Sequence, residues 1–416
     1  MDIPKTVTIP MAMHIGRPAT PIVKIGDTVQ VGTKIGEANG AVSVPVYSSV
    51  SGKVTKIVDL LMSSGNTAPA VVIESDGAMT PADTVTPPVV NSREDLIDAI
   101  RESGIVGLGG AGFPTHVKLN VDPDRVDYLV VNGAECEPYV TSDTITMVDR
   151  ADDMAHGLEA LARYIGIKNV IIGIENNKKT AIRTMKQMAQ SITSCSVRVQ
   201  SLPSVYPQGG EKVLVYHTTG RVIPAGKLPI DVGCIVINCT TLAAIGAYLQ
   251  TGMPLVEKCV TVEGKAVQTP QNVIAPIGAS FADLFAACGG LKEEPDKLIY
   301  GGPMMGITVP DDSAPIMTNT NAILALTQKE AWLPKTTACI RCSACTNHCP
   351  FGLAPAALSR AYDRKDVDTL KELHVDVCME CGCCSFVCPA NRPLVQKNKL
   401  GKQLLREEKA KEGDKQ

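Results

Sequence analysis

The first eighty residues alternate short apolar runs with glycine-containing turns. Residues 21–27, 29–32 and 51–57 each read as a short strand, and a glycine recurs every few positions. Strands this short and closely spaced are typical of a small all-β sandwich or barrel. The pattern therefore predicts an N-terminal β domain.

The pattern changes after Pro87 and Pro88, which favour an extended linker because proline and the residue before it disfavour helix. A helix is expected next, capped by Asn91 or Ser92 and ended by Gly104. Farther along, apolar strand-like runs alternate with helix-like stretches. The expected strands are 128–131, 170–174 and 235–237, and the expected helices are 152–165, 178–191 and 240–250. This alternation predicts an α/β layer with a largely parallel sheet.

A third pattern follows over residues 254–308, where a hairpin over 259–267 and a further strand precede a helix. A Ser280-x-x-Asp283 capping box opens this helix and Gly289-Gly290 closes it. The segment therefore predicts a compact α+β unit.

These patterns predict a multidomain α/β and α+β protein. We place domains at 1–85, 92–252, 253–320 and 335–396, followed by a charged segment over 397–416. That last segment holds seven basic and four acidic residues. We interpret it as a solvated helix or frayed tail, with docking to a partner or a membrane surface as the alternative.

Composition narrows the function. The chain has 416 residues and a formal net charge of −3, so no global positive field favours nucleic acid. No apolar run approaches the roughly 18 residues of a membrane-spanning helix. The N-terminus has an early acid and proline instead of a signal peptide's apolar stretch, so we expect a cytoplasmic location, or one on the cytoplasmic face of a membrane. In that reducing setting, clustered cysteines indicate metal more often than disulfides.

Eight of the fifteen cysteines form two runs of the pattern C-x2-C-x2-C-x3-C-P. This is the spacing of bacterial two-cluster ferredoxins, in which the fourth cysteine of each run binds the other cluster. We therefore assign the ligands of two [4Fe–4S] clusters as follows: Cys339, Cys342, Cys345 and Cys388 for the first, and Cys378, Cys381, Cys384 and Cys349 for the second. A pair of zinc ribbons, the alternative, leaves the repeated x3-Cys-Pro unexplained. We expect Cys383 to pack beside its cluster.

A glycine-rich segment lies at Gly107-Leu108-Gly109-Gly110-Ala111-Gly112. It satisfies G-x-G-x-x-G, but a helix is predicted before it where a dinucleotide fold has a strand. Four glycines in six residues nevertheless expose backbone N–H groups that can approach a phosphate closely, and Lys118 could add positive charge. A purely structural glycine turn is the alternative.

Two long segments carry a family resemblance. Residues 107–118 (GLGGAGFPTHVK) and 129–139 (LVVNGAECEPY) resemble the FMN and NADH domain of the RnfC family, and GGAGFPT is also similar to the flavin subunit of respiratory complex I. Further segments agree in order: MHIG at 13–16, YPQGGEK at 206–212, GGPMMG at 301–306 and ECGCC at 380–384. The resemblance covers nearly the whole chain, and it implies that residues 253–320 form a β-grasp domain of the soluble-ligand-binding (SLBB) type.

The N-terminal domain resembles the lipoyl/biotinyl hammerhead fold, through V-K-x-G-D-x-V-x-x-G-x-x-I-G at 23–36 and S-x-V-S-G-K-V at 48–54. Carrier domains of that fold have a modified lysine at the tip of a central hairpin. The corresponding residues 37–41 read EANGA. We therefore expect no carrier role for this domain, and interpret it as structural or as an interaction surface.

The resemblance to RnfC also implies roles for individual residues. The glycine loop (Gly107, Gly109, Gly110, Gly112) is expected to hold the FMN phosphate, and Lys118 and Asn132 to bond phosphate or ring. Phe113 is expected to stack on nicotinamide or flavin. Contacts to flavin and NADH hydroxyls fall to Glu135, Glu137 and Glu211, with Gly209 and Gly210 beside them; Glu135 and Phe113 are the candidate catalytic residues. Cys136 could serve in packing or in redox chemistry.

The implied function is electron transfer between NADH and a one-electron acceptor, through FMN and two [4Fe–4S] clusters, in either direction. The expected partners are NADH and a redox protein: Rnf membrane subunits, ferredoxin or a downstream reductase. Two alternatives stay open. One is a soluble relative that feeds cobalamin reduction in microcompartments or an amino-acid reductase. The other is a non-catalytic electron-wire adaptor.

Overall fold

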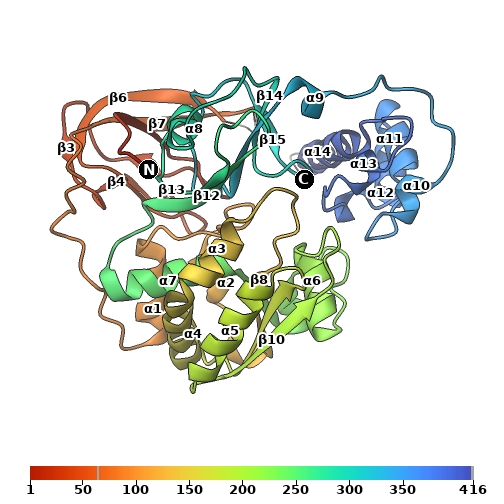
Figure 1. Ribbon diagram of the computed structural model, residues 1–416. Helices are drawn as coiled ribbons and strands as arrows, with labels where there is room; N and C mark the ends of the chain where they lie inside the picture. Colours follow the sequence, from red (N-terminus) through yellow and green to blue (C-terminus); the bar gives the residue numbers. More distant parts are fainter. Residues whose placement is uncertain (63–64, 414–416) are drawn as a thin grey trace.

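The computed structural model describes residues 1–62 and 65–413. In Figure 1 the N-terminal β domain and the unit around β12–β16 lie together above the α/β domain, and the C-terminal helices lie to one side of both. The mixed α/β and α+β architecture predicted from the sequence is confirmed.

The N-terminal domain consists of two small sheets, with strand orders β1-β7-β6-β3 and β2-β4-β5. Its strands are β1 (Thr6–Pro10), β2 (Thr20–Pro21), β3 (Thr28–Val29), β4 (Lys34–Glu37), β5 (Val46–Tyr47), β6 (Gly52–Leu61) and β7 (Thr67–Ser75). Val7 and Ile9 alternate inward and pack against Val71 and Ile73. The tip that replaces the carrier lysine lies against the α/β domain instead, where the Ala41 carbonyl is 3.3 Å from Nε2 of His116.

The α/β domain is built on four parallel strands in the order β10-β9-β8-β11. They are β8 (Tyr128–Gly133), β9 (Asn169–Glu175), β10 (Ser196–Leu202) and β11 (Cys234–Asn238). The helices are α1 (Arg93–Glu102), α2 (Thr115–Leu119), α3 (Ser142–Asp149), α4 (Ala151–Ile165), α5 (Lys179–Ser191), α6 (Glu211–Thr219) and α7 (Cys239–Thr251), with 3₁₀ turns at Pro123–Arg125 and Pro229–Val232. Ser92 caps α1 as expected.

Both faces of this sheet are buried, which explains its continuous apolar strands. Leu129 and Val131 belong to a core shared with α1, α4, α5 and α7, whereas Val130 packs with residues of α6 on the other face. The chain builds outward from β8 to β10 and then returns to place β11 on the other side of β8. Ligand sites in parallel sheets form at the carboxyl ends of strands at such a switch point.

The next unit is a five-stranded sheet in the order β13-β12-β16-β14-β15, covered by α8 (Phe281–Ala287). Its strands are β12 (Glu257–Glu263), β13 (Gln271–Pro276), β14 (Lys297–Tyr300), β15 (Ile307–Val309) and β16 (Ala322–Leu326). The expected hairpin is longer than predicted, because β12 pairs with β13 and not with a strand ending at Val267. The Ser280–Asp283 capping box is present.

The C-terminal helices are α9 (Gln328–Ala331), α10 (Ala344–Asn347), α11 (Pro355–Asp363), α12 (Val367–Glu372), α13 (Cys383–Phe386) and α14 (Leu394–Gly413), with a 3₁₀ turn at Val375–Val377. Left-handed backbone recurs at the same relative positions of the two cysteine runs: at Arg341 and Glu380, at Ser343 and Gly382, and at Gly352 and Asn391. The two runs therefore share one backbone path.

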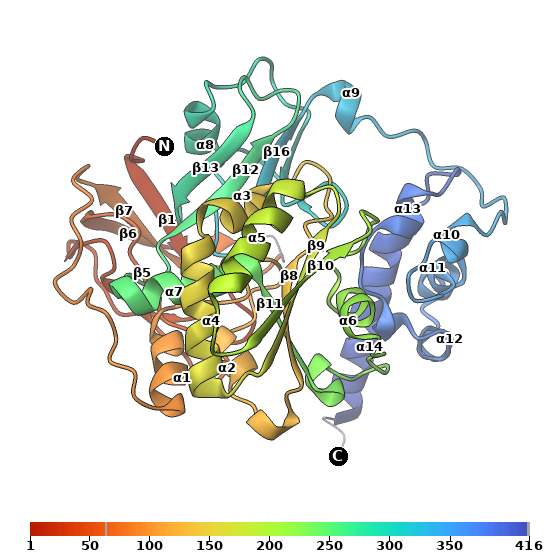
Figure 2. The same cartoon turned by 60° about the horizontal axis from the view of Figure 1, so that its bottom comes forward.

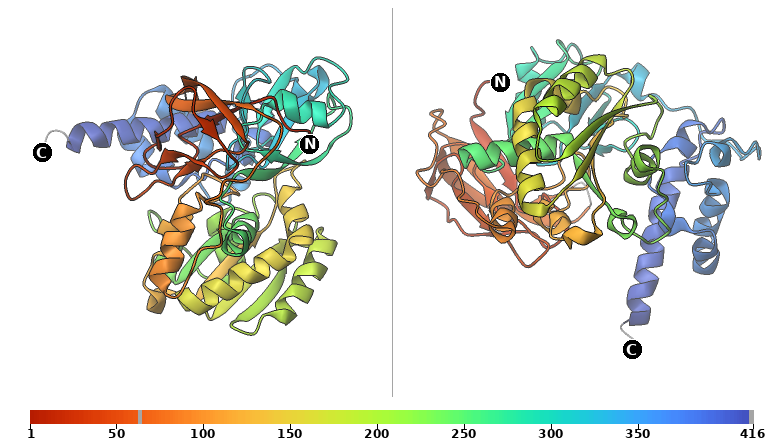
Figure 3. Two further views of the ribbon diagram at one scale, coloured as in Figure 1. Left: turned by 90° about the vertical axis from the view of Figure 1, so that its left-hand side faces the viewer. Right: turned by 90° about the horizontal axis from the view of Figure 1, so that it is seen from below.

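The predicted boundary at residue 397 is wrong, because α14 continues through it. Leu394, Asn398 and Leu405 are buried on one side of this helix, and Leu405 packs with Leu358 of α11. The segment interpreted as a charged tail is thus part of the C-terminal domain as far as residue 413, and its last three residues lie outside the described ones. The end of α14 projects beyond the other helices (Figure 3). No described helix is long and apolar enough to cross a bilayer.

Candidate functional site

The glycine loop lies at the switch point, between the carboxyl ends of β8 and β11 and the two β domains. Gly109, Gly110 and Ala111 are exposed. Gly107 donates its N–H to the Phe113 carbonyl (2.9 Å) and Leu108 donates to Oγ1 of Thr241 (2.9 Å). Within the described part of the chain, the N–H groups of residues 109–112 have no acceptor. The loop thus presents four consecutive free donors, the arrangement that binds phosphate.

The carbonyl groups of the same loop are held by other domains. Lys258 of β12 donates from Nζ to the Leu108 carbonyl, and Nδ2 of Asn319 donates to the Gly110 carbonyl at 3.0 Å. From the N-terminal domain, the Ile15 N–H donates to the Gly112 carbonyl at 3.0 Å. Burial lowers the pKa of Lys258 to about 8. The loop conformation is therefore fixed by protein contacts before any ligand binds.

Two glycines of the loop serve different purposes. A Cβ on Gly109 would overlap the amide of Asn238, so this position needs glycine for packing. A Cβ on Gly110 would meet no protein atom within 4 Å. The space beside Gly110 is free for a ligand, which fits the phosphate-binding role expected of the loop.

Two asparagines flank the loop at the strand ends. Asn132 of β8 and Asn238 of β11 are register partners. Asn132 donates to the Gly209 carbonyl (2.9 Å), while Asn238 caps α7 and donates to Oδ2 of Asp143 (2.8 Å). Sequence analysis missed Asn238, although an asparagine between a strand and a helix is a recognisable cap signal.

Lys118 and Glu211 lie together beside these strand ends. Lys118, on α2, donates from Nζ to the Val236 carbonyl of β11 (3.0 Å) and lies 3.4 Å from Oε1 of Glu211. Both side chains are partly exposed, with 32% and 43% of their surfaces accessible. The ammonium is thus available to an anion at the site.

Glu135 and Glu137 are already engaged by protein donors. Glu135 accepts from the N–H groups of Asp143 and Thr144 at the start of α3, from the Thr144 hydroxyl and from Lys178. Burial, followed by the charge of Asp143, raises the pKa of Glu135. Glu137 accepts from the N–H groups of Met304 (3.0 Å) and Met305 (2.7 Å), which ties it to the GGPMMG segment. Both carboxylates therefore order neighbouring segments, and Phe113 is half-buried at the end of the loop.

The segment around Gly209 links the α/β domain to the C-terminal domain. Gly209 donates to Sγ of Cys136 (3.3 Å), and burial raises the pKa of that thiol to about 11, so it is neutral and packed. A Cβ on Gly210 would overlap Met379. Tyr206 donates from its hydroxyl to the Cys381 carbonyl at 2.6 Å. Figure 2 shows the C-terminal helices beside α6.

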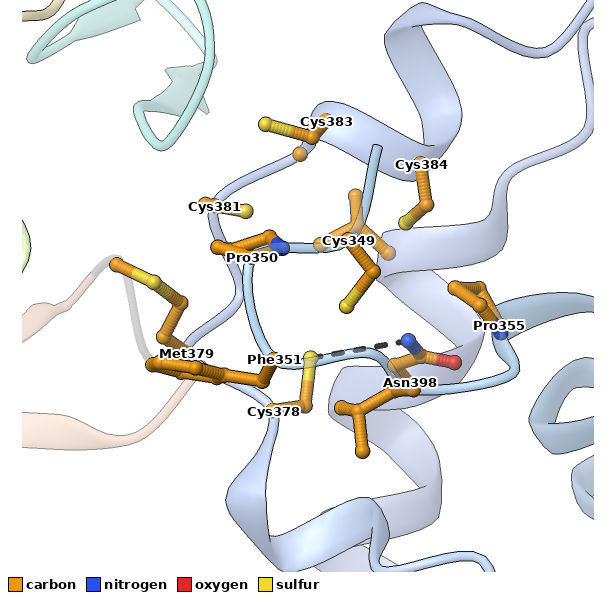
Figure 4. A pocket seen from close by; sticks show the side chains of 13 residues that line it. Cys349, Pro350, Phe351, Pro355, Cys378, Met379, Cys381, Cys383, Cys384 and Asn398 are labelled. Atoms are coloured by element: carbon orange, nitrogen blue, oxygen red, sulfur yellow. Dashed lines mark hydrogen bonds between the residues drawn. The ribbon is translucent and has the colours of Figure 1, made fainter. Parts of the chain in front are cut away.

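The eight cysteines surround two separate cavities. One is lined by Cys349 together with Cys378, Cys381 and Cys384, and holds about 330 Å³ not filled by protein atoms. In Figure 4 these four sulfur atoms point toward a common space, whereas that of Cys383 points away. The other cavity is lined by Cys388 together with Cys339, Cys342 and Cys345. Each cavity therefore takes its fourth cysteine from the other run, the grouping that the crossed assignment requires.

In the described residues, no three His, Cys, Asp or Glu side chains lie close enough to hold a single metal ion. The four thiols of each set surround a cavity, and a thiol set of this kind fits a [4Fe–4S] cluster. At the first cavity, Nδ2 of Asn398 lies 3.7 Å from Sγ of Cys378, an added hydrogen bond to a ligand sulfur.

Comparison with known families agrees with this layout. Residues 1–78 match the RnfC barrel sandwich hybrid domain, 100–247 the Nuo51 FMN-binding domain, 259–308 the SLBB domain and 332–400 the 4Fe–4S dicluster domain. The fold and site thus define a flavin- and iron–sulfur-binding electron-transfer protein, with FMN at the α/β domain and two clusters at the C-terminal domain.

Relatives place it more narrowly: the chain belongs to the RnfC family. It is 43% identical over 369 residues to the RnfC protein of the Na⁺-translocating ferredoxin:NAD⁺ oxidoreductase complex of Acetobacterium woodii, covering 87% of this chain and 82% of that one. It is 41% identical to the corresponding protein of the proton-translocating ferredoxin:NAD⁺ oxidoreductase complex of Clostridium ljungdahlii, covering 86% and 78%. With that of the ion-translocating oxidoreductase complex of Rhodobacter capsulatus the values are 37%, 98% and 79%.

Among solved structures, the fold is similar to a chain of an NAD⁺-reducing [NiFe]-hydrogenase in the H2-reduced state. The TM-score is 0.53 at 16% identity, over 76% of this chain and 63% of the hydrogenase chain. At this identity the likeness concerns the fold alone.

Proposed function

We propose that this protein exchanges electrons between NADH and a one-electron acceptor, as the RnfC component of a ferredoxin:NAD⁺ oxidoreductase. The observation that carries the proposal is the short protein connection between the two kinds of site. Gly209 is held by Asn132 at the end of β8, and the same segment reaches the first cysteine cavity through Tyr206 and Gly210.

FMN accepts a hydride and the clusters accept single electrons, so the bound groups supply the change from two-electron to one-electron chemistry. The chain's own residues bind and orient. The free N–H groups of residues 109–112 hold the phosphate, and Lys118 adds a charge-assisted contact. Glu135 and Glu137 fix α3 and the GGPMMG segment around the site, and Phe113 stacks beside the loop.

The named relatives belong to ion-translocating complexes. We therefore propose that this chain also assembles with membrane subunits, at the cytoplasmic face of the membrane. Co-fractionation with those subunits, and its loss when they are deleted, tests this placement.

The central test is anaerobic mixing of the FMN- and cluster-loaded protein with NADH. The flavin absorbance should bleach first, and cluster absorbance should then decrease without another reductant. Persistent flavin absorbance with intact clusters would instead establish the adaptor alternative, in which the flavin site does not react.

A further inference from the structure

The two cysteine cavities differ in the side chains that surround them. Around the cavity with Cys378, the described lining residues are cysteines, apolar residues and Asn398, without a charged side chain. Four arginines line the cavity with Cys339: Arg341, Arg360, Arg364 and Arg392. The described ion pairs of this domain use Lys397, Lys402 and Lys411 instead. Among the described residues, positive charge without ion-pair partners therefore gathers at one of the two cavities.

The arginine-lined cavity is also the more exposed one. Cys339 and Cys342 are exposed, whereas Cys381 and Cys384 are buried. Ile340, between Cys339 and Arg341, leaves 68% of its surface accessible and lines the same cavity. An exposed apolar side chain surrounded by arginines has the composition of a protein interface, in which arginine is enriched.

We propose that this face is the docking surface for an electron-carrier protein whose own redox centre is surrounded by acidic side chains. The surface consists of Ile340 and the four arginines around Cys339 and Cys342, and the proposal rests on the function proposed above. One electron passes between the partners, so that one is oxidised and the other reduced, with no bond made or broken. Charge attraction accelerates such encounters, and redox partners form small interfaces.

The shape of the surface favours a protein over a lipid bilayer. The arginines and Ile340 line a hollow above the cysteines, into which the convex rim of a small protein can fit. A bilayer is flat on this scale and would meet only the outermost guanidinium groups. Binding to anionic lipid is accordingly the competing outcome of the test.

The test compares two double variants of the full-length, cluster-loaded protein. Arg360→Gln with Arg364→Gln removes two charges from the surface. The control, Arg406→Gln with Lys409→Gln, removes two exposed charges from α14 outside the cavity. The probe is an acidic bacterial two-cluster ferredoxin, whose Kd and electron-transfer rate are measured after photochemical reduction, which bypasses NADH and FMN. At low ionic strength the surface variant should lose about tenfold in affinity and rate, and the loss should shrink as salt is added. The control should match the parent.

Basic cytochrome c and anionic phosphatidylserine vesicles are measured alongside. For the parent, binding of ferredoxin should weaken with salt and that of cytochrome c should not. Arg360→Lys with Arg364→Lys should behave as the parent, which separates charge from any folding defect. The proposal is overturned if the Gln variant binds ferredoxin as tightly as the parent at low ionic strength, or loses vesicle binding alone. Failure of NADH to bleach the flavin would refute the proposed function while leaving the ferredoxin Kd measurable.

Discussion

The two cysteine runs follow the same backbone path and yet occupy opposite environments. Left-handed residues recur at matching positions of both runs, so the local structure around each set of sulfur atoms is the same. The inner set, with Cys378, is fastened to the flavin domain by the Tyr206 hydroxyl and to α14 by Lys402, which donates to the Cys378 carbonyl at 2.9 Å. The outer set, with Cys339, is exposed and lined by arginines. Cysteine spacing therefore determines what is bound, and the surroundings determine which site faces which partner.

The largest expected effect comes from breaking the crossed ligand sets. Cys349→Ala combined with Cys381→Ala should remove one cluster, leaving about four of eight iron atoms, because both cysteines line the inner cavity. Cys349→Ala combined with Cys342→Ala should remove both clusters, because these residues line different cavities. Iron and acid-labile sulfide analysis of anaerobically reconstituted protein measures this.

The matched control is Cys383→Ala, which should retain both clusters because its sulfur points away from the others in Figure 4. Should Cys349→Ala with Cys342→Ala retain four iron atoms, each cluster would take its ligands from its own run, and the comparison of inner and outer sets would have to be redrawn.

The second effect separates the flavin site from both clusters. Gly110→Val should abolish FMN binding and NADH-driven cluster reduction, because its branched side chain enters the open space beside the loop without meeting protein. Iron content and reduction by dithionite should stay unchanged. Gly107→Ala is the control: its Cβ would lie at an ordinary 3.6 Å from Phe113, and its N–H is already bonded. Normal FMN binding by Gly110→Val would place the flavin elsewhere.

A smaller effect is expected from Lys118→Ala, which removes one charge-assisted contact worth roughly 1.5–3 kcal/mol. FMN should dissociate more readily, as measured by flavin fluorescence on dilution, and less so at high salt. A loss larger than that of Gly110→Val would assign the phosphate mainly to the lysine instead of the loop.

The smallest effect concerns the contact between the flavin domain and the inner set. Tyr206→Phe removes the hydrogen bond to the Cys381 carbonyl, worth about 0.5–1.5 kcal/mol. Hydrogen–deuterium exchange should rise in residues 378–388 and stay constant in 339–349. Equal increases in both segments would show that the domain moves as one body and that the contact is not specific to the inner set.

Features that depend on near neighbours in the sequence were predictable. The cysteine spacing predicted two grouped sets, and the apolar runs predicted the parallel strands β8, β9 and β11. The charge of residues 397–416 concealed the buried side of α14, because Asn398 and Leu405 are the few inward positions among many solvated ones.

Contacts between domains were not predictable in this way. Lys258 and Asn319 hold the glycine loop from positions more than a hundred residues away, and no spacing relates them to it. Glu135 lies inside the segment that resembles a flavin site, yet its carboxylate satisfies the free N–H groups at the start of α3. A helix start leaves such donors unpaired, and a nearby acid is a favourable acceptor.

The support of the glycine loop has a consequence for how the protein matures. Its carbonyl groups are held by Ile15 from the N-terminal domain and by Lys258 and Asn319, which follow the α/β domain in the chain. The parallel sheet has its own core, but the phosphate-binding conformation needs all of these segments in place. Flavin incorporation is therefore a late event, after the domains have docked, and the flavin content of a preparation measures the fraction of molecules whose architecture is complete.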